Sequence, residues 1–152
     1  MSWTARKPKD LDLQLTIGDD CRIFTNQRNC SGAHLDTDWK QGGTEAGGGG
    51  VETITIDQYQ DPDTKYMVFV SNIANDEYPM SRSNAVVTLY FGNQFKTINA
   101  PNSGDQTDSK GNGYWIIGCF TGFTRLGFID ERNIYSDNYD YDCYPNNAKN
   151  YS

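Results

Sequence analysis

The sequence predicts a single all-β domain, an antiparallel β-sandwich of about nine strands with little or no helix. Short stretches in which apolar and polar residues alternate recur along the chain, and turns rich in Gly, Asn and Asp separate them. No window of a dozen residues has the 3.6-residue period of an amphipathic helix. The length of 152 residues suits one domain. A jelly roll or an irregular barrel would produce a similar pattern.

The first four expected strands alternate most clearly. LDLQLTI, residues 11–17, places its Leu and Ile residues on one face, and the turn GDD leads into CRIFTN, residues 21–26. AHLDTDW, residues 33–39, precedes the Gly-rich loop KQGGTEAGGGG. VETITI, residues 51–56, alternates again, with Glu52 on the face of the two isoleucines.

Turn signals separate the last five expected strands. DPDT leads into KYMVFVSNI, residues 65–73. A Gly-Asn pair is the two-residue hairpin signal between NAVVTLYF and QFKTI, residues 84–91 and 94–98. A long polar loop then precedes YWIIGCF and TRLGFI, residues 114–120 and 124–129.

The charge balance is acidic, with 20 Asp and Glu against 13 Lys and Arg and a formal net charge of -7. Such a surface repels phosphate backbones, so we expect no nucleic-acid partner. No apolar run reaches the ~20 residues of a membrane span. The N-terminus lacks the apolar segment of a signal peptide. We interpret Met1 as a start added to a domain of a longer secreted protein; the alternative is a native start.

Four cysteines favour an extracellular location. Their spacings are not those of CxxC zinc sites, and the one histidine leaves such a site poorly supplied. Four cysteines allow three pairings, of which we expect the local ones, Cys21–Cys30 and Cys119–Cys143. Each would add about 2–4 kcal/mol of stability. The alternative is four buried free thiols in a cytosolic protein.

Two Asp-x-Asp pairs are the sharpest functional signal. Asp10 and Asp12 lie at the first expected strand, Asp36 and Asp38 lie in the third, and residues two apart in a strand share a face. Glu52, at the next strand, adds a fifth carboxylate. Ca²⁺ takes six to eight oxygen ligands in irregular geometry and needs no histidine, so we predict that these five side chains bind Ca²⁺ rather than Mg²⁺. The alternative is a solvated acidic strand face.

Several short motifs follow one known pattern. They are Trp3, Asp-Leu-Asp-Leu at 10–13, Leu-Asp-x-Asp at 35–38, Glu52, and Tyr-x-Val-x-Val at 66–70. Over roughly residues 3–92 the chain thus resembles the YfaP-like family of secreted β-sandwich domains. Its members are mostly extracellular or envelope-associated, so the resemblance implies a β-sandwich with an acidic cluster. The cysteines and the Tyr-rich C-terminus depart from the family's pattern.

Two further features, a Gly-rich run and the histidine, are interpreted as structural. The run GGTEAGGGG lacks the Gly-Lys-Ser/Thr of a phosphate loop, and no helix follows it. No acidic stretch fits the EF-hand register. His34 is the one histidine, and no nucleophile motif accompanies it, so we expect a strand residue without a catalytic role.

The C-terminal segment, about residues 131–152, mixes tyrosines with Asp and Asn. Exposed tyrosines among such groups stack on sugars or contact proteins, which makes this segment a weak candidate for ligand binding. The tyrosines concerned are Tyr135, Tyr139, Tyr141 and Tyr144. The alternative is an irregular segment that packs on the sandwich and is held by Cys143.

These observations predict a secreted, non-catalytic, Ca²⁺-binding β-sandwich module for adhesion, matrix or surface assembly, with a glycan or an extracellular protein as partner. The second hypothesis is a Ca²⁺-dependent carbohydrate-binding module that uses the C-terminal tyrosines. The third is a small glycoside hydrolase with two of the carboxylates as its catalytic pair, which the absence of cleft-forming insertions disfavours.

Overall fold

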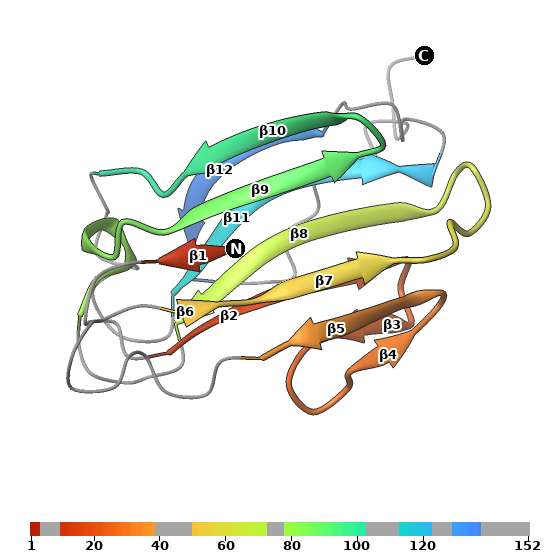
Figure 1. Ribbon diagram of the computed structural model, residues 1–152, viewed down its shortest axis with the longest axis horizontal. Coiled ribbons are helices and arrows are strands. Elements are labelled where there is room, and N and C mark those ends of the chain that lie inside the picture. The colour runs from red at the N-terminus through yellow and green to blue at the C-terminus, as the bar shows by residue number, and fades with distance from the viewer. Residues whose placement is uncertain (4–9, 39–49, 73–77, 103–112, 123–128, 138–152) are drawn as a thin grey trace, which may run out of the picture.

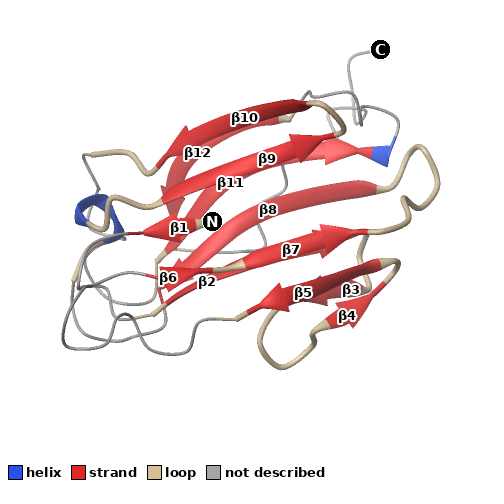
Figure 2. Ribbon diagram, in the orientation of Figure 1, coloured by secondary structure: helices blue, strands red, loops and turns tan. Residues whose placement is uncertain are grey.

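The chain is all-β, as the alternation predicts. The computed structural model describes residues 1–3, 10–38, 50–72, 78–102, 113–122 and 129–137. Within these ranges twelve strands form three antiparallel sheets, and one short 3-10 turn, η1 (Met80–Arg82), interrupts them. Figure 2 shows how strands account for most of the described chain. No helix in these ranges has the length and hydropathy to cross a membrane.

Two layers make up the sandwich (Figure 1). The rear layer is one sheet in the order β12-β11-β8-β2-β3. Its strands are β2 (Leu11–Ile17), β3 (Cys21–Ile23), β8 (Lys65–Asn72), β11 (Tyr114–Thr121) and β12 (Asp130–Ser136).

The front layer consists of two sheets, in the orders β10-β9-β1-β6 and β4-β5-β7. Its strands are β1 (Ser2–Trp3), β4 (Asn29–Cys30), β5 (Ala33–Thr37), β6 (Gly50–Val51), β7 (Thr53–Ile56), β9 (Val86–Phe91) and β10 (Gln94–Asn99). Only Glu52 separates β6 from β7, so the two sheets follow one another in the same layer (Figure 1).

The rear sheet is covered on both faces. The main core lies between the layers and takes alternate residues of the rear strands, among them Leu13, Val68 and Trp115. A second, smaller cluster on the opposite face contains Phe69 and Ile116. Burial on both faces explains why β8 and β11 are nearly continuous apolar runs rather than alternating ones.

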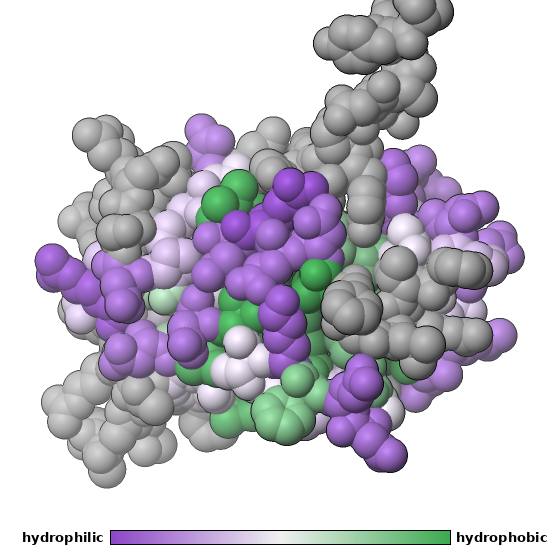
Figure 3. All heavy atoms as spheres, turned by 90° about the horizontal axis from the view of Figure 1, so that it is seen from above, coloured by the Kyte–Doolittle hydropathy of each residue, from purple (hydrophilic) through white to green (hydrophobic). Residues whose placement is uncertain are grey.

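Covalent and ionic links join the layers. The disulfide Cys21–Cys30 connects β3 to β4 with a Cα–Cα distance of 6.0 Å, which confirms this predicted pairing. Cys119 is also disulfide-bonded, while Cys143, its expected partner, lies outside the described residues. At the opposite end, Lys96 of β10 lies 2.6 Å from Glu131 of β12. Seen from above, this end has polar side chains interspersed with apolar ones (Figure 3).

The largest departure from the expected strands is at the C-terminus. Residues 124–128 of the expected last strand lie outside the described ranges, and the observed strand is β12, most of which falls in the Tyr-rich C-terminal segment where no strand was expected. DERNIYS does not alternate, and its pairing with β11 is irregular: the register shifts between Ile116 and Gly118. Long-range pairing thus creates a strand where local periodicity is absent.

Candidate metal centre

Three carboxylates converge at the start of β2. One oxygen from each of Asp10, Asp12 and Glu52 lies within 4.8 Å of the other two, and these residues are called the acidic cluster below. Asp12 is 4% exposed and Glu52 only 1%. Oxygens bound to one Ca²⁺ at about 2.3–2.6 Å lie at most about 5 Å apart, so the spacing fits a shared ion. The cluster therefore unites three of the five predicted ligands.

The acidic cluster forms where β2 loses a neighbour. β3 pairs with β2 only from Leu15 to Ile17, so the earlier part of that edge has no partner from β3. Thr25, which follows β3, donates a hydrogen bond of 3.1 Å from Oγ1 to Oδ1 of Asp12. The predicted alternation of β2 is correct, but its polar face is largely buried: Asp12 and Gln14 are each 4% exposed.

Glu52 closes the open edge of β2. Its Oε2 accepts a hydrogen bond of 2.6 Å from the backbone N–H of Leu13. Its own backbone pairs with Met1: the Glu52 N–H donates to the Met1 carbonyl at 3.0 Å, and the Met1 ammonium donates to the Glu52 carbonyl at 2.7 Å. A front-layer residue thus takes the place that β3 leaves open in the rear layer.

A β-bulge separates the two residues of the second Asp-x-Asp pair. Leu35 pairs with Ile54 and Thr37 with Thr53, so Asp36 is an extra residue between two successive pairs. The side chain of Asp38 is only 3% exposed, whereas that of Asp36 is 34% exposed. The prediction that these two aspartates share a face is therefore wrong, because it assumed an unbroken strand.

Asp38 faces the acidic cluster, and Asp36 does not. One further step in the β5–β7 register places Asp38 opposite Glu52, and the charge of Asp38 raises the pKa of Asp12. Asp38 Oδ2 also lies 3.6 Å from Nη1 of Arg28. Asp36 instead bonds to His34 and Thr55. Four of the five predicted ligands thus belong to one neighbourhood, and Asp36 lies outside it.

The electrostatic environment makes ionisation of Asp12 unfavourable. Burial is the main cause of its raised pKa, and the charge of Asp38 acts in the same direction. The hydrogen bond from Thr25 and the positive charge of Arg22 act in the opposite direction without cancelling the effect. A divalent cation would reverse this balance by stabilising the ionised carboxylates.

Two side chains at this site were not identified from the sequence. Thr25 and Arg28 both lie in the connection between β3 and β4. No spacing or motif marks them, because their contacts with Asp12 and Asp38 arise only when this connection folds back against the start of β2.

His34 is held between two carboxylates on the exposed side of β5. Its Nε2 lies 2.6 Å from Asp36 Oδ1, and its Nδ1 lies 2.7 Å from Asp57 Oδ2. Desolvation lowers the pKa of His34 and is the largest single effect, but the combined hydrogen bonds and charges of Asp36 and Asp57 raise it overall. Both ring nitrogens donate in this arrangement, so the imidazolium form is favoured.

We predict that the imidazole of His34 titrates above its ordinary value of 6.5. As the one histidine, it gives a single C2–H signal to follow by NMR. Asp57→Asn should lower the pKa, whereas Asp19→Asn, at an exposed turn, should leave it unchanged. The stabilisation of the fold by the contacts of His34 with the two carboxylates is complete below pH 6.5, and it is lost as the pH rises through the folded-state pKa of His34. A value at or below 6.5 would contradict the prediction.

Tyr135 is used internally. It lies in β12, and its hydroxyl donates a hydrogen bond of 2.7 Å to the carbonyl of Pro101. The other tyrosines proposed for ligand binding, Tyr139, Tyr141 and Tyr144, lie outside the described residues. The described part of the C-terminal segment therefore packs on the sandwich.

A groove in the front layer is separate from the carboxylates. It is a groove of about 510 Å³ between β7 and β9, and none of the described residues that line it carries an acidic, basic or imidazole side chain. Asp10, Asp12 and Glu52 are not among the described residues that line this groove, so it lacks the paired carboxylates of an acid–base site.

Comparisons of the chain with protein-family models, with curated proteins and with solved structures gave no match. The resemblance to the YfaP-like family therefore stays a prediction, and the candidate function depends on the geometry of the site.

Proposed function

We propose that the chain is a secreted, non-catalytic β-sandwich module that holds one Ca²⁺ among Asp10, Asp12, Asp38 and Glu52 and serves in adhesion or surface assembly. The convergence of three carboxylate oxygens within 4.8 Å at a largely buried edge is the observation that carries this proposal. Gathering such groups without a cation is unfavourable, because each charge opposes the ionisation of its neighbours.

The donor set favours Ca²⁺ among common metal ions. All the proposed side-chain ligands are oxygens, and His34 is bonded to Asp36 and Asp57 rather than directed at the cluster. Oxygen ligands suit hard cations, and Ca²⁺ tolerates the irregular arrangement that a strand edge and a bulge create. Zn²⁺ would prefer nitrogen or sulfur ligands.

The proposed role of the ion is structural. Asp10 and Asp12 come from the rear layer, whereas Asp38 and Glu52 come from the front layer. One cation would therefore join the layers at one end of the sandwich, and the Cys21–Cys30 disulfide also joins them. Two such links suit a module that works outside the cell, where disulfides persist. The described side chains that line the groove include no carboxylate or imidazole, which supports a non-catalytic role over the hydrolase hypothesis.

Thermal unfolding in Ca²⁺, in Mg²⁺ and in EDTA, at fixed ionic strength, tests the proposal. An ion at 100 times its Kd adds about 2.7 kcal/mol. For a domain of this size, that corresponds to a rise in Tm of roughly 5–10 °C. We expect this rise in Ca²⁺ alone. Identical melting curves in all three solutions would show that the acidic cluster is a structural feature without a bound ion.

Calorimetric titration of variants with Ca²⁺ locates the site. Asp38→Asn should weaken binding at least tenfold, because it removes a charged ligand. Asp36→Asn is the matched control, since it removes the same charge two residues away, from a side chain on the exposed face. Equal affinities for the two variants would exclude Asp38 as a ligand.

A further inference from the structure

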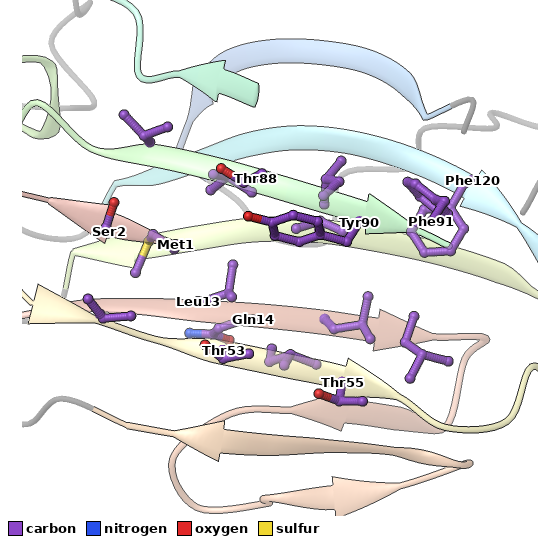
Figure 4. A pocket seen from close by; sticks show the side chains of 18 of the residues that line it. Met1, Ser2, Leu13, Gln14, Thr53, Thr55, Thr88, Tyr90, Phe91 and Phe120 are labelled. Atoms are coloured by element: carbon purple, nitrogen blue, oxygen red, sulfur yellow. The ribbon is translucent and has the colours of Figure 1, made fainter. Parts of the chain in front are cut away.

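The groove between β7 and β9 interrupts the front layer. Val68 of the rear sheet and Phe120 lie at its floor, and the facing edges of β7 and β9 form its walls. Figure 4 shows Thr53 and Thr55 on one wall, with Thr88 and Tyr90 on the other. The groove thus reaches from the surface to the main core.

β1 fills only one end of this interruption. It pairs with both sides, since Ser2 lies opposite Val51 of β6 and also opposite Val86 of β9. The ladder between β1 and β6 ends with the two reciprocal hydrogen bonds between Met1 and Glu52. Beyond them, no described strand lies between β7 and β9. At the end that β1 fills, the two sides of the interruption are therefore one strand apart.

The backbone of β9 offers hydrogen-bonding groups to this space. Phe91 and Gln94 flank a two-residue turn, which makes them a hydrogen-bonded pair. Successive pairs of an antiparallel ladder alternate, so Thr88 and Thr97 are a non-hydrogen-bonded pair whose N–H groups point away from each other. The Thr88 N–H therefore points toward the groove, and that of Thr97 points toward the outer edge of β10.

The backbone of β7 is arranged in the same way. The N–H and C=O of Glu52 both point toward β1, so those of Ile54 and Ile56 point to the same side. These two side chains, with Leu89 of β9, are only partly buried although they pack against the main core. The groove thus combines unpaired strand edges with an apolar floor.

We propose that this groove binds an extended segment of a partner polypeptide by β-strand addition, antiparallel to both β7 and β9. Main-chain groups would supply affinity, and alternate apolar side chains would enter the core. The span facing β7 accommodates on the order of four or five residues. The segment would continue the line of β1, whose two interfaces it extends. The inference does not depend on the proposed cation.

An extension of the chain itself tests the fit. Met1 and Trp3 pack against the core, so residues added before Met1 should alternate outward and inward. The segment Thr-Val-Thr-Val-Thr placed directly before Met1 directs both valines into the groove. We expect a rise in Tm of about 5 °C or more, and no rise when proline replaces both valines and removes their N–H groups. Equal melting temperatures for the two extensions would overturn the proposal.

A labelled peptide of the same five residues tests binding in trans to the unextended chain, in EDTA as well as in Ca²⁺. Thr88→Pro should weaken binding at least tenfold, because it removes a donor to the incoming strand. Thr97→Pro, directly across the β9–β10 pair, is the matched control and should bind within twofold of the parent chain. Equal affinities for the two variants would overturn the proposal.

The oligomeric state, measured by light scattering, tells whether a second copy of the chain occupies the groove. We expect a monomer, since the proposal assigns the groove to a different polypeptide. A dimer that Thr88→Pro abolishes and Thr97→Pro retains would show that a second copy fills the groove, and would overturn that assignment. If Thr88→Pro does not fold, the two extensions still decide whether the groove accepts a strand, since they leave β9 unchanged.

Discussion

Asp12→Asn is expected to stabilise the protein in EDTA and to remove at least half of its stabilisation by Ca²⁺. Burial and the charge of Asp38 raise the pKa of Asp12, so its ionised form opposes folding. Asparagine keeps an oxygen to accept the hydrogen bond from Thr25 but carries no charge. The same change removes a charged Ca²⁺ ligand, which weakens binding at least tenfold, or about 1.4 kcal/mol.

The pH dependence gives an independent measurement of this effect. The folded-state pKa of Asp12 lies above its ordinary value of 3.8. The contribution of Asp12 protonation to folding stability is therefore complete below pH 3.8 and is lost as the pH rises through the folded-state pKa. In EDTA, the parent chain should therefore lose stability relative to Asp12→Asn as the pH rises from 3.8 through the folded-state pKa of Asp12. Parallel Tm–pH profiles of the two proteins would contradict the electrostatic account.

Asp36→Asn distinguishes a local effect from a change in net charge. It lowers the negative charge by the same amount, but Asp36 contacts His34 and Thr55 on the exposed side of β5. We expect no stabilisation in EDTA and an unchanged response to Ca²⁺. Stabilisation equal to that of Asp12→Asn would attribute both effects to the acidic surface as a whole.

Glu52→Ala is expected to be less stable than Glu52→Gln by about 2–4 kcal/mol in EDTA. Both variants lack the buried charge, so their difference isolates the hydrogen bond and the packing. Glutamine can still accept the hydrogen bond from Leu13 N–H, whereas alanine leaves that donor without its acceptor and creates a cavity. Urea unfolding followed by circular dichroism measures the difference.

Hydrogen exchange supplies the local readout for this comparison. The amide of Leu13 should exchange faster in Glu52→Ala than in Glu52→Gln, because β3 does not pair with β2 at this position. Equal stabilities with equal exchange rates would show that the Glu52 carboxylate does not support the edge of β2. Neither variant should retain Ca²⁺ binding at the affinity of the parent chain.

The alternation of apolar and polar residues predicted correctly which side chains face the core where two paired strands have no bulge. In β2, Leu13 belongs to the core and Asp12 to the opposite face, as the period of two requires. The same rule failed at Asp36 and Asp38, because one extra residue in β5 reverses the facing of everything after it. A bulge depends on the partner strand, and the sequence of β5 alone does not reveal it.

The sequence by itself determined the all-β class, most strand positions, the Cys21–Cys30 pairing and the choice of Asp10, Asp12, Asp36, Asp38 and Glu52 as candidate ligands. These follow from periodicity, turn chemistry and residue type, which are local properties of the chain. Tertiary structure alone decided that Asp38 faces the acidic cluster whereas Asp36 does not, and that a groove remains between β7 and β9. Both depend on which distant strands pair and where each pairing stops, and no local pattern encodes that.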